Sequence, residues 1–377
     1  MSYRRNPKIR PSRRRFLQYS LAALSGVALT NCQQRLASSP GDSSDDAPDA
    51  PAATDEPLHI YTWADYANDD VFARFTERTG IETVVDIYEA NEAMLARMLA
   101  GGGGQYSILY PSDYMVQEML ELDLLATIDH SQLEGLDRLS QRWQDPLYDA
   151  GNAHSVPVSW GTTGYIYDTR RLSPGPEDWD FAWDNRSALN RQITLLDDPR
   201  ETIGAALKSL GYSYNSTSED EIRAAADKLK ELRPAVRAFE SFGWEDRLIN
   251  GDLRLCMTYS IVGNALPSDH PNLSYIIPAS GSSVWTDAMV IPKTAPNPEA
   301  AYAWINFMME PENAAFAVEQ LKFATPNQDA FDQLPNELKD NDKLFPGEDV
   351  LSTCEGIAPV GEATQLYDDL WTEIRSA

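Results

Sequence analysis

Carboxylate and aromatic side chains recur close together at widely separated points of the sequence. Trp63, Asp65 and Tyr66 form one such group, and Trp285 and Asp287 form another. A charge-assisted hydrogen bond from an ammonium group to a carboxylate contributes about 1.5–3 kcal/mol, and a desolvated cation–π contact contributes about 2 kcal/mol. A few contacts of each kind are enough for the roughly 8 kcal/mol of a micromolar ligand. The pattern therefore suits an elongated cation with an apolar stem.

The elements that must position these residues alternate between strands and helices. Short β-rich runs predict strands at 58–62, 83–87, 106–110, 192–196, 253–258 and 288–291. Apolar residues at helical spacing predict helices at 69–79, 91–99, 199–210, 219–232 and 298–309. This alternation indicates an α/β fold with largely parallel sheets.

In open α/β sheets, ligands bind beyond the carboxyl ends of the strands, and this rule selects candidate site residues. The residues at or next to such ends are Trp63, Asp65 and Tyr66; Ser112, Asp113 and Tyr114; Asp197, Asp198 and Glu201; Tyr259; and Trp285 and Asp287, which we expect just before the strand at 288–291. The set contains aromatics and carboxylates and no base.

Structural roles compete with binding at several of these positions. Asp198, with Pro199 after it and Glu201 at the third helical position, has the pattern of a helix N-terminus. Trp63 and Tyr66 could each be a core aromatic, and Asp287 could be a turn residue. Their coincidence at strand ends of distant segments favours a binding site.

Length, charge and composition exclude several classes of protein. The 377 residues suit two lobes plus tails, and the net charge of −27 argues against nucleic acid as a partner. The four histidines lack the spacing of metal ligands, so we expect neither a metal nor a cofactor. Paired carboxylates also occur in glycosidases, but the chain has no nucleophile elbow or HExxH motif, so we expect no enzyme. Cys256 and Cys354 are either buried thiols or a disulfide pair.

The N-terminal segment has the features of an export signal. The run SRRRFLQ at 12–18 resembles a twin-arginine signal, and the apolar stretch behind it is too short to span a bilayer. The residues before Cys32 resemble a lipobox, although Asn31 stands where Gly or Ala is preferred. We therefore expect a signal at 1–32, lipidation of Cys32 and, because 33–57 is rich in Ser, Pro, Ala and Asp, a disordered tether at 33–57.

From about Leu58 to its end, the chain resembles the periplasmic spermidine/putrescine-binding proteins of ABC transporters. The matching segments are IYTWADY at 60–66, FTERTGI at 75–81, YEANEAM at 88–94, LYPSDYMV at 109–116, LLDDPRETI at 195–203, LKSLGYSYNST at 207–217, WTDAMVIP at 285–292, AWINFMMEP at 303–311 and ATPN at 324–327. The resemblance implies a two-lobed periplasmic-binding-protein fold of type II, with hinge-linked lobes and a ligand cleft between them. The implied lobes are 58–158 plus 288–323, and 159–287 plus 324–377, with crossings near Val158, Asp287 and Ala324.

The resemblance also implies ligand-binding roles for particular side chains. They are Trp63, Asp65, Tyr66, Ser112, Tyr114, Asp198, Glu201, Ser241, Tyr259, Trp285 and Asp287. Tyr259 replaces a tryptophan, Phe323 stands where a tyrosine is usual, and Ile357 falls near an expected glutamine. The last two departures each remove a polar contact, so the preferred polyamine stays open.

The function implied is binding of spermidine or putrescine and delivery to an ABC transporter permease. We expect a periplasmic monomer that is tethered to the cytoplasmic membrane through lipidated Cys32. The alternatives are a polyamine-sensing receptor subunit, or a protein of the same fold that binds another small amine or solute, such as an amino acid or ferric ion. An amino acid needs a cation for its carboxylate, and the candidate residues offer none.

Overall fold

The computed structural model describes residues 56–377. The predicted export signal, Cys32 and all of the predicted tether except its last two residues lie outside the described residues. Within 56–377, none of the helices combines the length and the apolar character needed to cross a bilayer.

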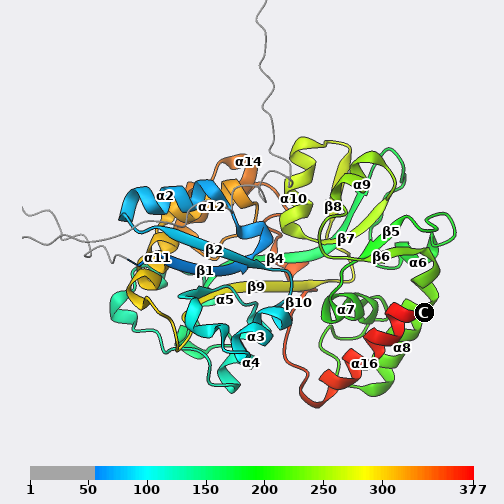
Figure 1. The fold of residues 1–377 in the computed structure, drawn as a ribbon. Helices are drawn as coiled ribbons and strands as arrows, with labels where there is room; N and C mark the ends of the chain where they lie inside the picture. The colour runs from blue at the N-terminus through cyan, green and yellow to red at the C-terminus, as the bar shows by residue number, and fades with distance from the viewer. Residues whose placement is uncertain (1–55) are drawn as a thin grey trace, which may run out of the picture. The chain divides into compact units, whose positions relative to one another are not determined.

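The described residues form two α/β lobes around a continuous sheet (Figure 1). Its strand order is β2-β1-β3-β9-β4-β7-β5-β6, with β10 beside β9 and β8 beside β4. The strands are β1 Leu58–Trp63, β2 Thr83–Tyr88, β3 Ile108–Leu109, β4 Ser155–Asp168, β5 Ile193–Leu195, β6 Val236–Phe239, β7 Leu255–Tyr259, β8 Leu273–Ile276, β9 Ser283–Val290 and β10 Glu355–Gly356. The parallel pairs β1–β2 and β1–β3 belong to the first lobe, and β5–β6 and β5–β7 belong to the second.

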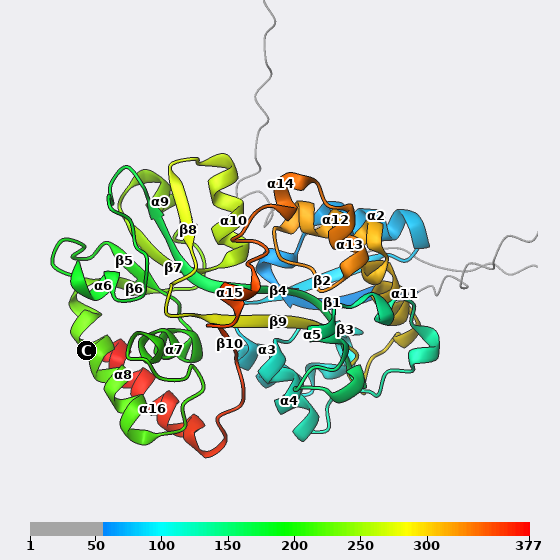
Figure 2. The ribbon, with the colours of Figure 1, turned by 180° about the vertical axis from the view of Figure 1, so that it is seen from behind.

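Helices cover the sheet of each lobe, as Figures 1 and 2 show from opposite sides. Those of the first lobe are α2 Asp69–Thr79, α3 Asn91–Leu99, α4 Asp113–Glu121, α5 Gln141–Gln144, α11 Pro298–Met309, α12 Pro311–Leu321, α13 Gln328–Gln333, α14 Asn336–Lys339 and α15 Glu348–Leu351. Those of the second are α6 Phe181–Asp184, α7 Pro199–Ser209, α8 Glu219–Leu232, α9 Glu245–Asn250, α10 Ser260–Asp269 and α16 Thr364–Ser376.

Local sequence signals explain where the principal helices begin and end. Asn68 caps α2 by accepting from the backbone N–H groups of Asp70 and Val71, and Gly80 ends the helix in the left-handed conformation. Asn297 caps α11 in the same manner. The helix bounds expected at 69–79, 91–99, 219–232 and 298–309 are therefore confirmed.

Two long strands connect the lobes. The first half of β4 pairs with β9, from Ser155 opposite Val290 to Thr162 opposite Val284, and its second half pairs with β7 and β8. β9 begins at Ser283, so the expectation that Trp285 and Asp287 precede a strand is wrong: both lie inside β9. The entire strand is buried between the lobes, and its run of Ser, Thr and Asp masks the apolar signal of a strand.

Packing places the last part of the chain differently from the sequence-based division at 324. The apolar residues Ala330, Leu334 and Leu344 belong to the same buried cluster as the first-lobe residues Phe75 and Trp304. The C-terminal helix α16, by contrast, packs in the core of the second lobe. Ala324 does contact crossing strand β4, through a bridge to Trp160, but the chain then returns to the first lobe. It leaves that lobe only near β10.

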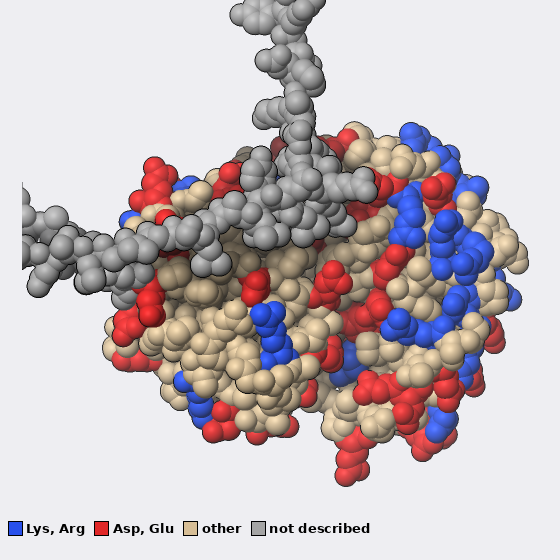
Figure 3. All heavy atoms as spheres, in the orientation of Figure 1, with Lys and Arg blue, Asp and Glu red and all other residues tan. Residues whose placement is uncertain are grey.

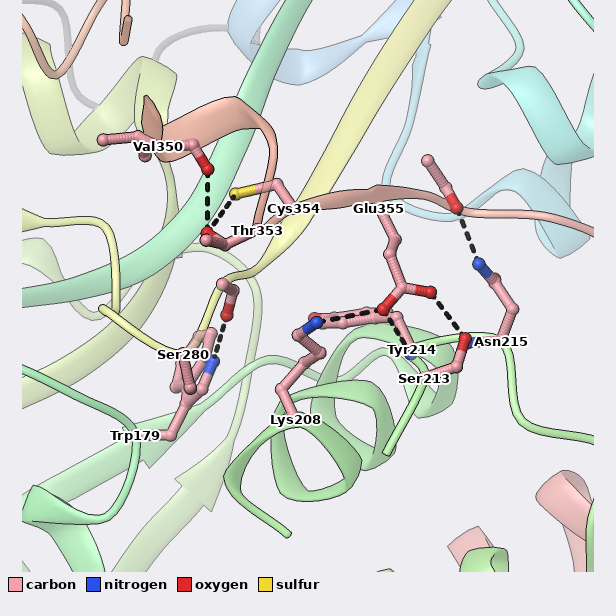
Figure 4. Close-up of polar contacts among 12 residues, drawn as sticks. Trp179, Lys208, Ser213, Tyr214, Asn215, Ser280, Val350, Thr353, Cys354 and Glu355 are labelled. Atoms are coloured by element: carbon pink, nitrogen blue, oxygen red, sulfur yellow. Dashed lines mark hydrogen bonds and ion pairs between the residues drawn. The ribbon is translucent and has the colours of Figure 1, made fainter. Parts of the chain in front are cut away.

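The segment around β10 is bound to the second lobe by a set of polar contacts (Figure 4). One carboxylate oxygen of Glu355 accepts from Lys208 Nζ at 3.0 Å and from the backbone N–H of Tyr214 at 3.2 Å, and the other accepts from Ser213 Oγ at 2.5 Å. Asn215 donates to the carbonyl of Gly356 at 2.8 Å. This third crossing segment is therefore anchored beside α7. The neighbouring Cys354 is a free thiol, as is Cys256, so the disulfide alternative is wrong.

Gly164 in crossing strand β4 allows a close backbone approach that we expect to be essential. A β-carbon at this position would lie 2.0 Å from the carbonyl oxygen of Ile276, a backbone atom that no rotamer change can move. We predict that Gly164→Ala lowers the free energy of unfolding by at least about 1 kcal/mol. Denaturant titration measures this change. The matched control is Gly104→Ala, where the added carbon meets nothing within 4 Å. Equal midpoints for the two variants would contradict the prediction.

Candidate ligand-binding cleft

A cleft of about 800 Å³, including open space at its mouth, lies between the lobes. Its lining includes all eleven expected binding residues: Trp63, Asp65, Tyr66, Ser112, Tyr114, Asp198, Glu201, Ser241, Tyr259, Trp285 and Asp287. The strand-end residues Asp113 and Asp197 line it as well. The binding roles themselves stay predictions.

Four further polar or aromatic lining residues are not among the expected ones: Glu89, Asn91, Glu92 and Phe242. Glu89 directly follows the carboxyl end of β2, and Asn91 and Glu92 open helix α3. The rule that selected the other strand ends therefore applies to β2 as well. Phe242 lies in the loop after β6, beside Ser241, and could have been found in the same way.

Asp287 lies on β9 in the floor of the cleft. Its two carboxylate oxygens accept hydrogen bonds from Tyr66 Oη at 2.6 Å and from Ser112 Oγ at 2.8 Å. These donors come from the ends of β1 and β3, so the parallel strands of the first lobe converge on this residue. Burial raises the pKa of Asp287 to about 6, although the hydrogen bonds act in the opposite direction.

Glu201 occupies the corresponding place in the second lobe, in the first turn of α7. Its carboxylate accepts from Thr163 Oγ1 at 3.0 Å, from Ser283 Oγ at 2.9 Å and from Tyr214 Oη at 2.7 Å. Two of these donors lie on the crossing strands β4 and β9. Burial and the neighbouring Asp198 raise the pKa of Glu201.

Asp198 caps a helix and also lines the cleft. One oxygen accepts from the backbone N–H of Glu201 at 3.0 Å and caps α7. The same residue lines the cleft, and burial together with the charge of Glu92 raises its pKa. The N-terminus of α7 therefore holds two acids at the cleft, whereas Arg200, in the same turn, does not line the cleft.

Aromatic rings form the walls between these acids. The rings of Tyr259 and Trp285 meet edge to face, with centroids 6.2 Å apart. The Tyr114 hydroxyl accepts from Asn91 Nδ2 at 2.9 Å and donates to Glu92 Oε1 at 3.0 Å. These bonds hold its ring at the N-terminus of α3. Trp285 Nε1 is buried and has no acceptor among the described residues.

Negative charge dominates the cleft. Eight of its lining residues are Asp or Glu, and none is Lys, Arg or His. On the face drawn in Figure 3, acidic atoms gather where the lobes meet, whereas basic atoms are concentrated over the second lobe. Asp65 responds to this environment, since burial and the charge of Glu245 raise its pKa to about 6. Within residues 56–377, no three His, Cys, Asp or Glu side chains are arranged to hold a metal ion.

The model of the bacterial extracellular solute-binding proteins matches residues 70–346. The chain belongs to this family. It is 31% identical over 330 residues to the spermidine/putrescine-binding periplasmic protein of Salmonella typhimurium, covering 87% of this chain and 94% of the relative. This is a family of solute-binding proteins and not a family of enzymes.

Solved structures agree with the fold. The substrate-binding protein PotD of Streptococcus pneumoniae is 34% identical, with a TM-score of 0.75 over 85% of this chain and 99% of that one. The PotD lipoprotein of Treponema pallidum is 26% identical, with a TM-score of 0.77 over 85% and 100%. The expected two-lobed α/β fold of the periplasmic binding proteins is thus confirmed.

The raised pKa of Asp287 predicts a stability cost in the unliganded protein. The pKa of Asp287 is about 6 in the folded protein and about 4 in the unfolded chain. The contribution of this residue to stability therefore falls as the pH rises from about 4 to about 6 and above. Asp287→Asn keeps the shape and an acceptor and removes the charge. We predict that it raises the free energy of unfolding by up to about 3 kcal/mol at pH 7.5 and changes little at pH 4.

Denaturant titration at the two pH values measures this effect. The exposed Asp137→Asn is the matched control and should shift neither curve. A loss of stability at pH 7.5 would show that the hydrogen bonds to the Asp287 carboxylate outweigh its desolvation.

Proposed function

We propose that this chain binds a polyamine such as spermidine or putrescine in the cleft and delivers it to the membrane permease of an ABC transporter. The observation that carries the proposal is a cleft lined by eight acids, no base and several aromatic rings. Ammonium groups neutralise the acids, and the rings cover the methylene chain between them.

The names of the relatives support this choice of ligand. The Salmonella protein is named for spermidine and putrescine, and a putrescine-binding protein of Pseudomonas aeruginosa is 30% identical over 345 residues. An amino acid is disfavoured because the cleft lining offers no cationic side chain for its carboxylate. A sensing receptor would use the same binding chemistry, so it differs from a transport protein only in the partner it contacts.

Both lobes supply ligand contacts in this proposal. Trp63, Asp65 and Tyr114 belong to the first lobe, whereas Asp198 and Glu201 belong to the second. A ligand that contacts both sets stabilises the closed arrangement of the lobes, with β4, β9 and the segment around β10 as hinges.

Export and anchoring form part of the proposal. The twin-arginine-like signal would carry the chain across the cytoplasmic membrane. Lipidation of Cys32 would then anchor it to that membrane, where it would act as a monomer. Because 33–57 is polar and rich in Pro and Ser, it would leave the cleft free to meet the permease. Mass spectrometry of the mature chain tests the anchor, because cleavage before Cys32 with an attached diacylglyceryl group has a definite mass.

Calorimetry with putrescine, spermidine, spermine, an amino acid and a sugar tests the ligand class. We expect micromolar or tighter binding of at least one polyamine and none of the sugar. Saturation by a sugar or amino acid, with no polyamine binding below millimolar concentration, would sink the proposal.

Binding should release protons near pH 6. Asp65 and Asp287 have pKa values of about 6 without ligand, and a nearby ammonium lowers them because it favours the carboxylate. Affinity should therefore fall as the pH falls through 6 and level off above about pH 7, since the amines stay charged throughout this range. Calorimetry at pH 6 in two buffers of different ionisation enthalpy measures the released protons. Proton uptake, or an affinity independent of pH between 5 and 7.5, would contradict the prediction.

A further inference from the structure

Asp113 is an acid of the cleft that the hydrogen-bond networks described above do not use. It is the first residue of α4, lines the cleft and is 6% exposed. Its Oδ1 accepts from the backbone N–H of Tyr114 at 2.9 Å. Among the described residues, no further donor or cation contacts this carboxyl.

The other buried acids of the cleft are better supplied with donors. Asp287 accepts from two hydroxyl groups, and Glu201 accepts from three. Asp198 accepts from a backbone N–H and, at 3.5 Å, from Tyr259 Oη. A carboxylate taken out of water needs such partners, because an unpaired buried charge is strongly disfavoured. Asp113 therefore depends on a partner from outside the chain to become ionised.

The protein groups around Asp113 do not provide that partner. Its Oδ2 lies 3.9 Å from where a β-carbon would stand on Gly356, and the next residue, Ile357, lines the cleft with an apolar side chain. Tyr148 Oη is buried nearby and has no partner among the described residues. Arg200 lowers the pKa of Asp113 less than burial raises it, and its guanidinium donates to Asn215 Oδ1 and to the carbonyl of Ala358 rather than to Asp113.

Neighbouring acids act in the same direction as burial. Asp287 and Glu201 both raise the pKa of Asp113, as burial does to a greater extent. These acids, together with the half-buried Asp198, form a group of four carboxyls. Asp198 and Glu201 both belong to the N-terminus of α7, whereas Asp113 lies on α4 and Asp287 on β9. A diamine brings two positive charges to this group, and a triamine brings three. Because Asp113 has the fewest donors of its own, we expect it to be the last of these carboxyls to ionise and therefore the one that needs the third ammonium.

We propose that Asp113 is a specificity-determining residue that accepts an ammonium group of the ligand and gives the cleft a preference for amines with three or more nitrogens over diamines. The inference rests on the proposed polyamine-binding function. It assigns to the first turn of α4 a polar ligand contact that the apolar side chain of Ile357, which also lines the cleft, cannot make.

Calorimetry of the wild type and of Asp113→Asn with putrescine and spermidine tests the inference. We expect the wild type to bind spermidine at least tenfold more tightly than putrescine. The variant should weaken spermidine binding at least tenfold and putrescine binding less than threefold. It should also release fewer protons than the wild type when spermidine binds at pH 6. Glu121→Gln, an exposed acid at the far end of the same helix, is the control and should change neither affinity.

The outcomes separate this inference from the function on which it rests. A wild type that binds no polyamine overturns both. A wild type that binds polyamines but favours putrescine, or a variant that weakens both ligands equally, overturns the role of Asp113 and leaves polyamine binding intact. Asp113→Ser, which keeps an acceptor for the Tyr114 N–H, is the second variant. It should reproduce the selective loss if charge, rather than the fold of α4, is responsible.

Discussion

Several carboxyl groups are buried around one cavity whose lining contains no basic side chain, and the donors and crossing segments of the fold are arranged around them. Each acid is removed from water and lies close enough to the others to disfavour their ionisation. The fold supplies hydroxyl and backbone donors instead of cations: Tyr66 and Ser112 serve Asp287, and Thr163, Ser283 and Tyr214 serve Glu201. Neutral donors stabilise the acids without competing with a cationic ligand for their charge.

The crossing segments hold these donors in place from both lobes. β4 contributes Thr163, and β9 contributes Ser283 and carries Asp287 itself. Glu355 on the third segment accepts from the backbone of Tyr214, whose hydroxyl donates to Glu201. A rearrangement of the hinge would thus reach the buried acids of the cleft directly. This connection gives a physical route by which a bound cation and the arrangement of the lobes can influence each other.

The buried acids lower the stability of the unliganded protein and favour the binding of a cation. Acids that are costly to ionise in the empty cleft are those with the most to gain from an ammonium group, because the ligand removes the unfavourable part of their environment. In the proposed function, a bound ammonium relieves the cost of ionising these buried acids, and this relief contributes to the free energy of binding. In that function, we expect affinity to depend on the charge of the ligand through the number of acids rather than through any single contact.

The sequence alone predicted the α/β class, most of the long helices and most of the residues that line the cleft, because these depend on local periodicity, capping residues and turns. The Asn68 cap and the Gly80 stop bound α2 without reference to the rest of the chain. Strand β4 and the start of β9 were missed, since a strand buried on both faces need not alternate in hydropathy. The return of residues 324–354 to the first lobe and the free state of the two cysteines depend on contacts between distant segments, which no local pattern encodes. Contacts between distant segments also place the acids in one cavity and give hydroxyl donors to Asp287 and Glu201, whereas Asp113 accepts only from the backbone N–H of Tyr114.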